Sequence, residues 1–240
     1  MRKAIIIGVG AVNGLGAQLA IRFAKSNHHV VFAGRTKEKL QMVADRIGRF
    51  GGSCTQIIAN STDEQSVGSL FANAERIEGH LSLAIYNVGT NMPGRILEME
   101  ASYFEHCWRS CCFGAFLFGR EAVRAMHRTG GTLIFTGASA AMRGRENFGA
   151  FNAAKGAQRL LAQAMAKEYG PAGIHVAHVV VDGAIAGDRF IQGRPEIAER
   201  LGADGMISID GIVDAYEYLY NQPSNAWSFE VDLRTSVERW

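Results

Sequence analysis

The sequence predicts an α/β fold in which a doubly wound parallel sheet carries helices on both faces. Two observations support this prediction. Apolar segments of strand length alternate with helix-length segments along all 240 residues. The first strand also runs directly into a glycine-rich turn and then into an amphipathic helix. Strands separated by helices join through right-handed crossovers, which make the strands parallel.

The hydrophobic pattern places each expected element in order. We expect strands at 4–8, 29–33, 54–59, 81–86, 131–136, 174–181 and 227–233. We expect helices at 14–26, 36–49, 63–76, 100–128, 151–169 and 209–221. No long linker, internal repeat or low-complexity tract interrupts the series, so residues 1–240 are expected to form a single domain.

The composition excludes several classes of function. The formal net charge of +2 gives no basic footprint for a nucleic acid. No apolar run is long enough to cross a bilayer, and Met1-Arg2-Lys3 leads directly into a short strand rather than into a signal peptide. We therefore expect a cytoplasmic protein that binds neither nucleic acid nor membrane.

The cysteines and histidines do not predict a metal site. The seven histidines fall in no metal-ligand spacing, and the four cysteines show neither a zinc pattern nor a secreted disulfide framework. Cys107 and Cys111 are one helical turn apart. We interpret Cys54, Cys107, Cys111 and Cys112 as buried, reduced thiols of a cytosolic protein.

The glycine-rich turn after the first strand is the main binding signal. Gly10, Gly14 and Gly16 have the spacing G-x-x-x-G-x-G between a strand and a helix. Glycine lets the backbone approach a diphosphate closely, and the following helix offers unpaired N–H groups and the positive end of its dipole. We therefore expect a dinucleotide bound at Gly10, Asn13, Gly14, Leu15 and Gly16.

The end of the second strand indicates which dinucleotide is preferred. A site for NAD places an acid here against the ribose 2′-hydroxyl, but this chain has Gly34 followed by Arg35 and Thr36. The Arg35 cation suits a 2′-phosphate, so we expect NADP(H) to be favoured over NAD(H). Further cofactor contacts are expected after the third and fourth strands, at Asn60, Ser61, Asn87 and Gly89.

Several motifs together resemble the short-chain dehydrogenase/reductase family over essentially the full length. They are the glycine loop, the turn Asn87-Val88-Gly89, Ser139 with Lys155, and the tail from Ala226 to Leu233, in the order of the family. The resemblance implies a Rossmann-like sheet of about seven strands in one domain. It also implies assembly as a homodimer or homotetramer.

The same comparison exposes departures at the expected catalytic centre. In the family a tyrosine four residues before the lysine is the general acid/base, and the lysine holds the nicotinamide ribose. Here that tyrosine is replaced by Phe151, while Lys155 is retained. The position of the family's serine falls on Ala138, one residue before Ser139, and the position of its water-binding asparagine falls on Cys111.

Two hypotheses from different classes follow. In the first, the chain is an atypical oxidoreductase that transfers a hydride to or from a small carbonyl or enone, with Ser139 and Lys155 at its catalytic centre. The proton then comes from water, Ser139 or a substitute such as Tyr86, Arg143 or Arg145. In the second, the chain binds NADP(H) without dehydrogenase turnover, as a sensor or a partner subunit.

The sequence gives no substrate signature. Asp182-Gly183 replaces the family's Pro-Gly after the sixth strand, and the segment 183–205 carries charges of both signs. This segment is expected to be a substrate lid under the first hypothesis and a surface loop under the second.

Overall fold

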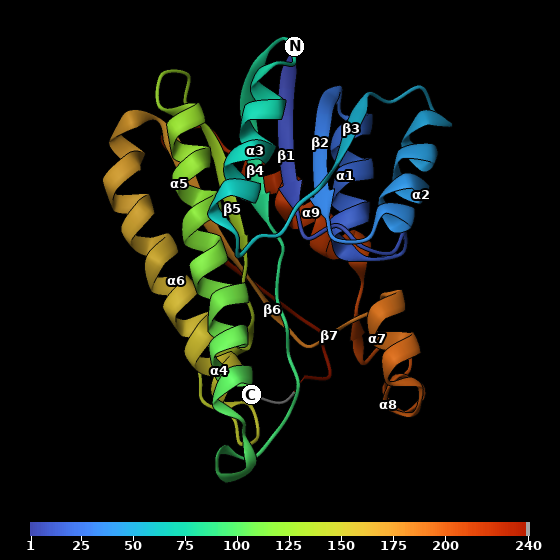
Figure 1. The fold of residues 1–240 in the computed structure, drawn as a ribbon. Coiled ribbons are helices and arrows are strands. Elements are labelled where there is room, and N and C mark those ends of the chain that lie inside the picture. Colours follow the sequence, from blue (N-terminus) through green and yellow to red (C-terminus); the bar gives the residue numbers. More distant parts are fainter. Residues whose placement is uncertain (239–240) are drawn as a thin grey trace.

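The computed structural model describes residues 1–238, and a seven-stranded sheet forms its centre (Figure 1). The strand order is β3-β2-β1-β4-β5-β6-β9, and every neighbouring pair is parallel. The strands are β1 (Arg2–Ile7), β2 (His28–Gly34), β3 (Cys54–Ile58), β4 (His80–Tyr86), β5 (Gly131–Thr136), β6 (Ile174–Asp182) and β9 (Glu230–Arg234). The order reverses between β1 and β4, so a ligand crevice is expected outside their carboxyl ends.

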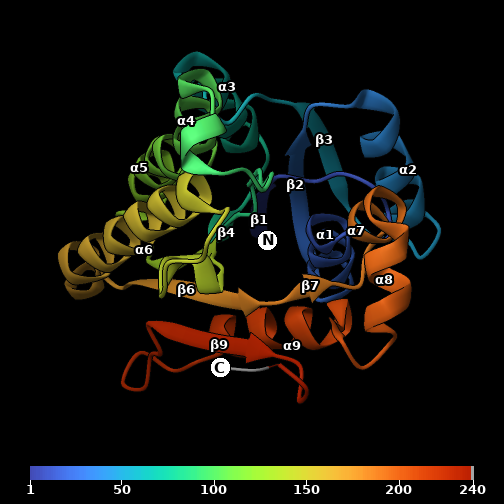
Figure 2. The ribbon, with the colours of Figure 1, turned by 90° about the horizontal axis from the view of Figure 1, so that it is seen from below.

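Helices cover both faces of the sheet, which confirms the predicted doubly wound fold (Figure 2). One layer consists of α1 (Leu15–Lys25), α2 (Lys37–Gly48) and α9 (Ile209–Tyr220). The other includes α3 (Glu64–Glu75), α5 (Gly114–Met126) and α6 (Gly149–Tyr169). Within β1, Ala4 and Ile6 join the first core, and Ile5 and Ile7 join the second. This alternation explains why a strand buried on both faces reads as a continuous apolar run.

The helix expected at 100–128 is interrupted. It consists of α4 (Ala101–Trp108), a π-helical turn (Arg109–Phe113) and α5. A π turn holds one more residue than an α turn and is frequent at functional sites. Cys111 lies in this turn.

The last strand begins three residues later than expected, at Glu230. Trp227 and Ser228 make other contacts, whereas the Phe229 carbonyl oxygen already accepts a ladder bond from the His178 N–H at 2.7 Å. The Trp227 ring stacks on His175 with centroids 4.9 Å apart, and the Ser228 N–H donates to the side-chain oxygen of Gln222. These contacts hold Trp227 and Ser228 beside the ladder, which the chain joins at the Phe229 carbonyl group.

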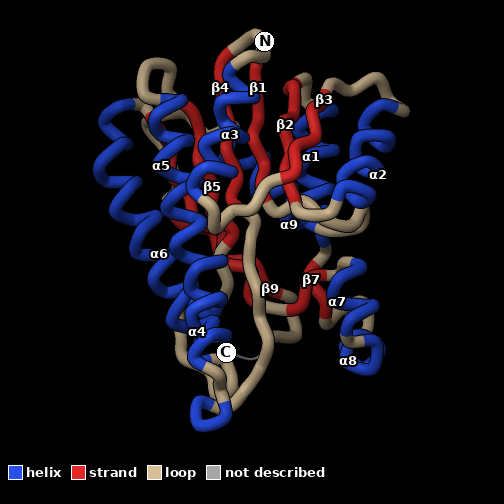
Figure 3. Tube along the Cα trace, viewed as in Figure 1, coloured by secondary structure: helices blue, strands red, loops and turns tan. Residues whose placement is uncertain are grey.

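The segment 183–205 contains short elements that the sequence pattern did not predict. It begins with β7 (Ala184–Ile185), which pairs with β8 (Met206–Ile207) just beyond the segment, and it holds α7 (Asp188–Gly193) and α8 (Pro195–Leu201). The two short helices stand beyond the carboxyl ends of the central strands, opposite α4 (Figure 3). Among residues 1–238, no helix combines the length and apolar character needed to cross a membrane.

The close contact between the start of α5 and the core leads to a prediction about stability. A methyl group on Gly114, the first residue of α5, would overlap the buried hydroxyl of Tyr86 and lie 2.7 Å from the Ser61 carbonyl oxygen. We expect Gly114→Ala to lower the free energy of unfolding by about 1–3 kcal/mol. Gly68, within α3, has open space around its Cα, so Gly68→Ala should raise stability by up to about 1 kcal/mol. Urea unfolding of both variants measures the contrast, and equal midpoints would contradict it.

Candidate active site

The turn after β1 approaches β4 very closely. Gly8 has a positive φ of 94°, and a Cβ at this position would overlap the Asn87 carbonyl group. A Cβ on Gly16, inside α1, would lie 2.6 Å from the Gly8 carbonyl oxygen. Both positions therefore require glycine for the packing of strand against helix. The prediction from spacing included Gly16 and missed Gly8, although a glycine directly after the first strand was a usable signal.

The outer side of the same loop is open. A Cβ on Gly10 would meet no atom within 4 Å, so glycine at this position keeps space clear rather than serving internal packing. Helix α1 begins at Leu15 after Gly14, which supplies no capping side chain. The first N–H groups of any α-helix have no intrahelical acceptor. Because no side chain caps them here, they favour an anion. These features fit the diphosphate of a dinucleotide.

Arg35 lies beside this loop. A Cβ on Gly34, the last residue of β2, would overlap the carbonyl group of Val9, so the end of β2 packs directly on the glycine loop. Arg35 follows at once and is exposed, as is Thr36, the N-cap of α2. The cation that sequence analysis associated with a 2′-phosphate thus stands next to the loop associated with the diphosphate.

The two expected contacts after β3 differ in their surroundings. Asn60 is exposed and orders its own turn, because its side-chain oxygen accepts bonds from the Thr62 N–H and hydroxyl. Ser61 is only 7% exposed, and its carbonyl group lies against Gly114 of α5. Asn60 therefore faces outward at the end of β3, and Ser61 faces the core.

Asn87 joins three strands at the point where the strand order reverses. Its amide donates to the Gly8 carbonyl oxygen at 3.2 Å, and its side-chain oxygen accepts from the Thr136 hydroxyl at 2.9 Å. The Thr136 oxygen also lies 2.7 Å from the Tyr216 hydroxyl of α9, which acts as the donor because Thr136 already donates to Asn87. Sequence analysis singled out Asn87 and missed Thr136 and Tyr216.

Lys155 lies at the same junction and is only 3% exposed. Its ammonium group donates to the Thr136 carbonyl oxygen at 2.7 Å and to the Gln158 side-chain oxygen at 2.8 Å. Its Nζ is 3.8 Å from the position a Cβ would take on Gly89. Burial lowers the pKa of Lys155, and the neighbouring thiols raise it. The structure thus joins Lys155 to the turn that holds Asn87 and Gly89.

Phe151 and Cys111, where the sequence comparison expects departures from the family pattern, lie near Lys155. The Phe151 ring centroid is 5.9 Å from Nζ, and the ring packs in a small apolar cluster with Cys107 and Cys111. Strand β5 ends at Thr136, and Ser139 opens a short 3₁₀ turn. Within a strand, an offset of one residue would move a side chain to the other face of the sheet. The offset between Ala138 and Ser139 lies in a loop instead, so it has no such effect.

The three substitute proton donors named from sequence have different environments. Tyr86 is fully buried and donates to the Ser110 carbonyl oxygen, and burial raises its pKa strongly, so the structure argues against Tyr86. Arg143 contacts both carboxylate oxygens of the buried Asp182, at 3.0 and 3.2 Å. Arg145 lies over the Phe148 ring.

Asn152 and α7 hold the loops around this site. The Asn152 amide donates to the carbonyl oxygens of Ala140 and Arg143, which fixes the loop after β5 on α6. From the other side, Arg189 of α7 donates to the Gly89 carbonyl oxygen at 3.2 Å. The backbone N–H of Asp188 donates to the Asn13 carbonyl oxygen. Helix α7 therefore contacts both the glycine loop and the turn after β4.

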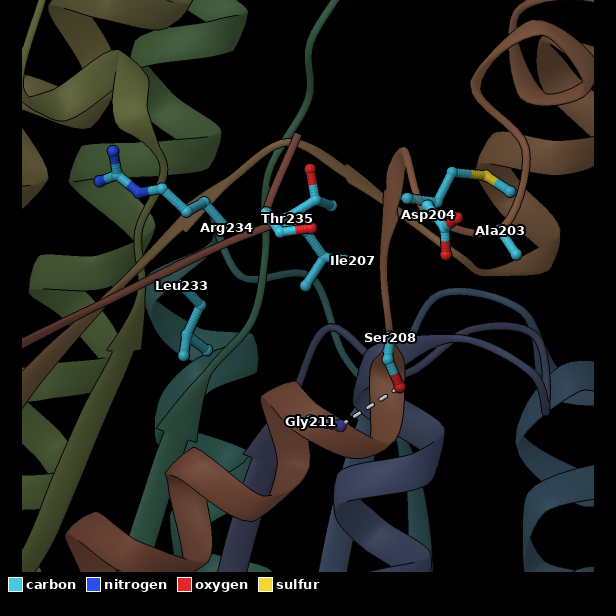
Figure 4. Close-up of a pocket in the computed structure, with 10 residues that line it drawn as sticks. Ala203, Asp204, Ile207, Ser208, Gly211, Leu233, Arg234 and Thr235 are labelled. Atoms are coloured by element: carbon cyan, nitrogen blue, oxygen red, sulfur yellow. Dashed lines mark hydrogen bonds between the residues drawn. The ribbon is translucent and has the colours of Figure 1, made fainter. Parts of the chain in front are cut away.

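A separate pocket of about 320 Å³ lies between the segment around β8 and the end of β9 (Figure 4). Ser208 lines it and caps α9 by accepting from the Gly211 N–H at 3.4 Å. None of the residues assigned above to the cofactor or to catalysis lines this pocket. Within residues 1–238, no three His, Cys, Asp or Glu side chains gather closely enough to hold a metal ion.

Comparison with known proteins agrees with this arrangement. Residues 3–189 match the family model described as short chain dehydrogenase. A 3beta-hydroxysteroid dehydrogenase of Mediterraneibacter gnavus is 29% identical over 71% of this chain, and the match spans 62% of that protein's length.

Solved structures agree over nearly the whole chain. A short-chain dehydrogenase from Rhodopseudomonas palustris is 31% identical, with a TM-score of 0.83 over 97% of this chain and 98% of that one. An alcohol dehydrogenase from Thermococcus sibiricus, complexed with 5-hydroxy-NADP, shares the fold, with a TM-score of 0.88 at 19% identity over 100% of this chain and 99% of that one. With its parallel sheet, glycine loop and buried lysine, this chain belongs to the short-chain dehydrogenase family of oxidoreductases.

Proposed function

We propose that the protein is an NADP(H)-dependent oxidoreductase that transfers a hydride to or from a small carbonyl or enone. The proposed proton donor is a group other than the side chain at position 151. Support comes from the open glycine loop, from Arg35 beside it and from Lys155 at the strand-order reversal. The relatives are named as dehydrogenases and reductases, and one structure of the same fold holds an NADP derivative.

The observation that carries this proposal is the position of Lys155. Two of the three N–H donors of its ammonium group are used by the Thr136 and Gln158 oxygens. The Gly89 turn beside Nζ follows β4, and the glycine loop follows the neighbouring β1, which supports a role for Lys155 at the edge of the proposed dinucleotide site. A bound NADP(H) would supply or accept the hydride here, and Lys155 would hold its ribose hydroxyls.

Cofactor preference tests the assignment of Arg35. We expect NADPH to bind more tightly than NADH, because the 2′-phosphate gains a charge-assisted bond of about 1.5–3 kcal/mol, or roughly 10- to 150-fold. Arg35→Ala should remove this preference. Arg49→Ala removes an equal charge at the far end of α2 and should preserve it. Fluorescence titration with both reduced cofactors measures the effect, and equal affinities in the unmodified protein would overturn the assignment.

We propose further that the chain forms a homodimer or homotetramer through α4, α5 and α6. Phe104, Trp108 and Phe116 are exposed on the first two helices, and Leu160 on α6 is 63% exposed. Phe118 lies in the same aromatic stretch of the sequence, but it is fully buried and belongs to the core. The exposed apolar side chains remain available for a second copy.

Light scattering tests this assembly. We expect a mass of two or four times 26.0 kDa at micromolar concentration. Leu160→Arg places a charge in the proposed interface and should reduce the mass. Met42→Arg on α2, where the side chain is 58% exposed, should not change it. A mass of one chain for the unmodified protein would contradict the proposal.

The replacement of tyrosine by Phe151 predicts weak turnover with simple ketones and aldehydes. A general acid contributes roughly 10²–10⁴ in rate, and a phenyl ring has no proton to give. Phe151→Tyr alone should gain little, because Ala138 provides no hydroxyl for the substrate oxygen and Cys111 replaces the amide that binds water. Groups that act together are strongly non-additive, so Ala138→Ser and Cys111→Asn should matter only once the tyrosine is present.

Turnover of the single, double and triple variants with NADPH checks this prediction, with cofactor affinity measured each time. Brisk turnover of the unmodified protein that Lys155→Ala abolishes at unchanged affinity would contradict the predicted weak turnover and would exclude the hypothesis of a protein without dehydrogenase activity. Tight NADPH binding without turnover of any aldehyde, ketone or enone would instead favour a sensor or a partner subunit.

A further inference from the structure

Helix α7 contacts two turns that are far apart in the sequence. The Asp188 N–H donates to the Asn13 carbonyl oxygen of the glycine loop at 3.2 Å. The Arg189 side chain extends to the turn after β4, where its Nη1 donates to the Gly89 carbonyl oxygen at 3.2 Å. Arg189 therefore reaches from the edge of the glycine loop to the turn that lies beside Lys155.

The backbone just before Arg189 packs tightly on the glycine loop. A Cβ on Gly187, the N-cap of α7, would lie 2.9 Å from the Asn13 carbonyl oxygen and 3.7 Å from the Gly14 Cα. Gly14 immediately precedes α1, whose first N–H groups favour an anion. Helix α7 thus stands next to the start of α1, where a diphosphate is expected (Figure 2).

The charge of Arg189 is not neutralised inside the protein. Its side chain is exposed, its hydrogen-bond partner is an uncharged carbonyl group, and no carboxylate of residues 1–238 forms an ion pair with it. By contrast, Arg22, Arg120 and Arg159 each bind a carboxylate. The glycine loop itself, residues 8–16, contains neither lysine nor arginine. A diphosphate bound at this loop therefore needs its cation from another segment.

We propose that Arg189 is a cofactor-binding residue whose guanidinium group binds the diphosphate of the dinucleotide. The inference rests on the proposed function, because it takes the glycine loop as the dinucleotide site. A guanidinium group has five N–H donors in a planar array. One of them is bonded to Gly89, so the others can donate to phosphate oxygens. A bound cofactor would then hold α7, and with it the segment 183–205, over the site.

The neighbouring Asp188 has the opposite effect. Its Oδ1 accepts a hydrogen bond at 3.4 Å from the side-chain amide of Asn13, which is expected to contact the cofactor. A carboxylate at this position repels a diphosphate and occupies the Asn13 amide in the free protein. Asp188 therefore weakens cofactor binding, whereas Arg189 strengthens it.

Fluorescence titration of the full chain with NADPH and with NADH tests this assignment. We expect Arg189→Gln to weaken the binding of both cofactors by about tenfold, because both contain the diphosphate and lose one charge-assisted bond. Arg189→Lys keeps the charge and should recover part of the loss. Asp188→Asn keeps an oxygen that can accept from Asn13 but removes the charge, so it should strengthen the binding of both cofactors about two- to fivefold.

Two comparisons separate a bond to the diphosphate from a general loss of packing. Arg200→Gln removes an equal charge from the exposed surface of α8 and should leave both affinities unchanged. The difference in affinity between the unmodified protein and Arg189→Gln should shrink as the salt concentration rises from about 0.05 to 0.5 M, because ions screen exposed charges. A purely structural role of Arg189 would not depend on salt in this way.

Two results would overturn the inference. One is unchanged affinity for both cofactors in Arg189→Gln. The other is a loss for NADPH alone, which would assign Arg189 to the 2′-phosphate. Either result retains the proposed function if the unmodified protein binds NADPH. If the unmodified protein binds neither dinucleotide, the proposed function and this inference are both rejected.

Discussion

The burial of a single ammonium group constrains the centre of this molecule. Lys155 is enclosed almost completely, so each of its N–H donors needs a partner inside the protein or in a bound ligand. The two protein partners come from separate elements, because Thr136 ends β5 and Gln158 lies one turn further along α6. The lysine therefore joins α6, in the second layer of helices, to the carboxyl end of β5.

Thr136 extends this constraint to the glycine loop. Its carbonyl oxygen binds Lys155, and its hydroxyl binds Asn87, whose amide holds the Gly8 carbonyl group. Tyr216 of α9 completes the chain of hydrogen bonds from the opposite face of the sheet. The loop that would hold a diphosphate and the lysine that would hold a ribose thus belong to one hydrogen-bond network. Moving either one would disturb the hydrogen bonds of the other.

Two of the departures expected from the sequence comparison, Phe151 and Cys111, lie in one small apolar cluster. Phe151 and the two thiols Cys107 and Cys111 pack together there, so the cluster offers a phenyl ring and polarizable sulfur atoms. By contrast, the loop after β5 is firmly held, since Asn152 binds two of its carbonyl groups and the buried Asp182 binds Arg143. Side-chain bonds to α6 and β6 therefore fix the loop beside Phe151.

The sequence by itself determined the fold class, the approximate ranges of the seven strands and the elements that carry the glycine loop, Arg35 and Lys155. These features are local, because apolar periodicity and glycine spacing act over a few residues. The sequence did not determine the helices in 183–205, where short, mixed-charge segments have no periodic signal. It also could not separate the exposed Phe104 from the buried Phe118, since both lie in the same apolar stretch.

Only the tertiary structure decided which polar groups meet. Asn87, Thr136, Lys155 and Tyr216 come from four different elements, and parallel crossovers bring them together at one edge of the sheet. Tyr86 looked available as a proton donor because it precedes Asn87, but the packing of α5 buries its hydroxyl. Burial and hydrogen-bond partners depend on residues that are distant in the chain, and for that physical reason no local pattern encodes them.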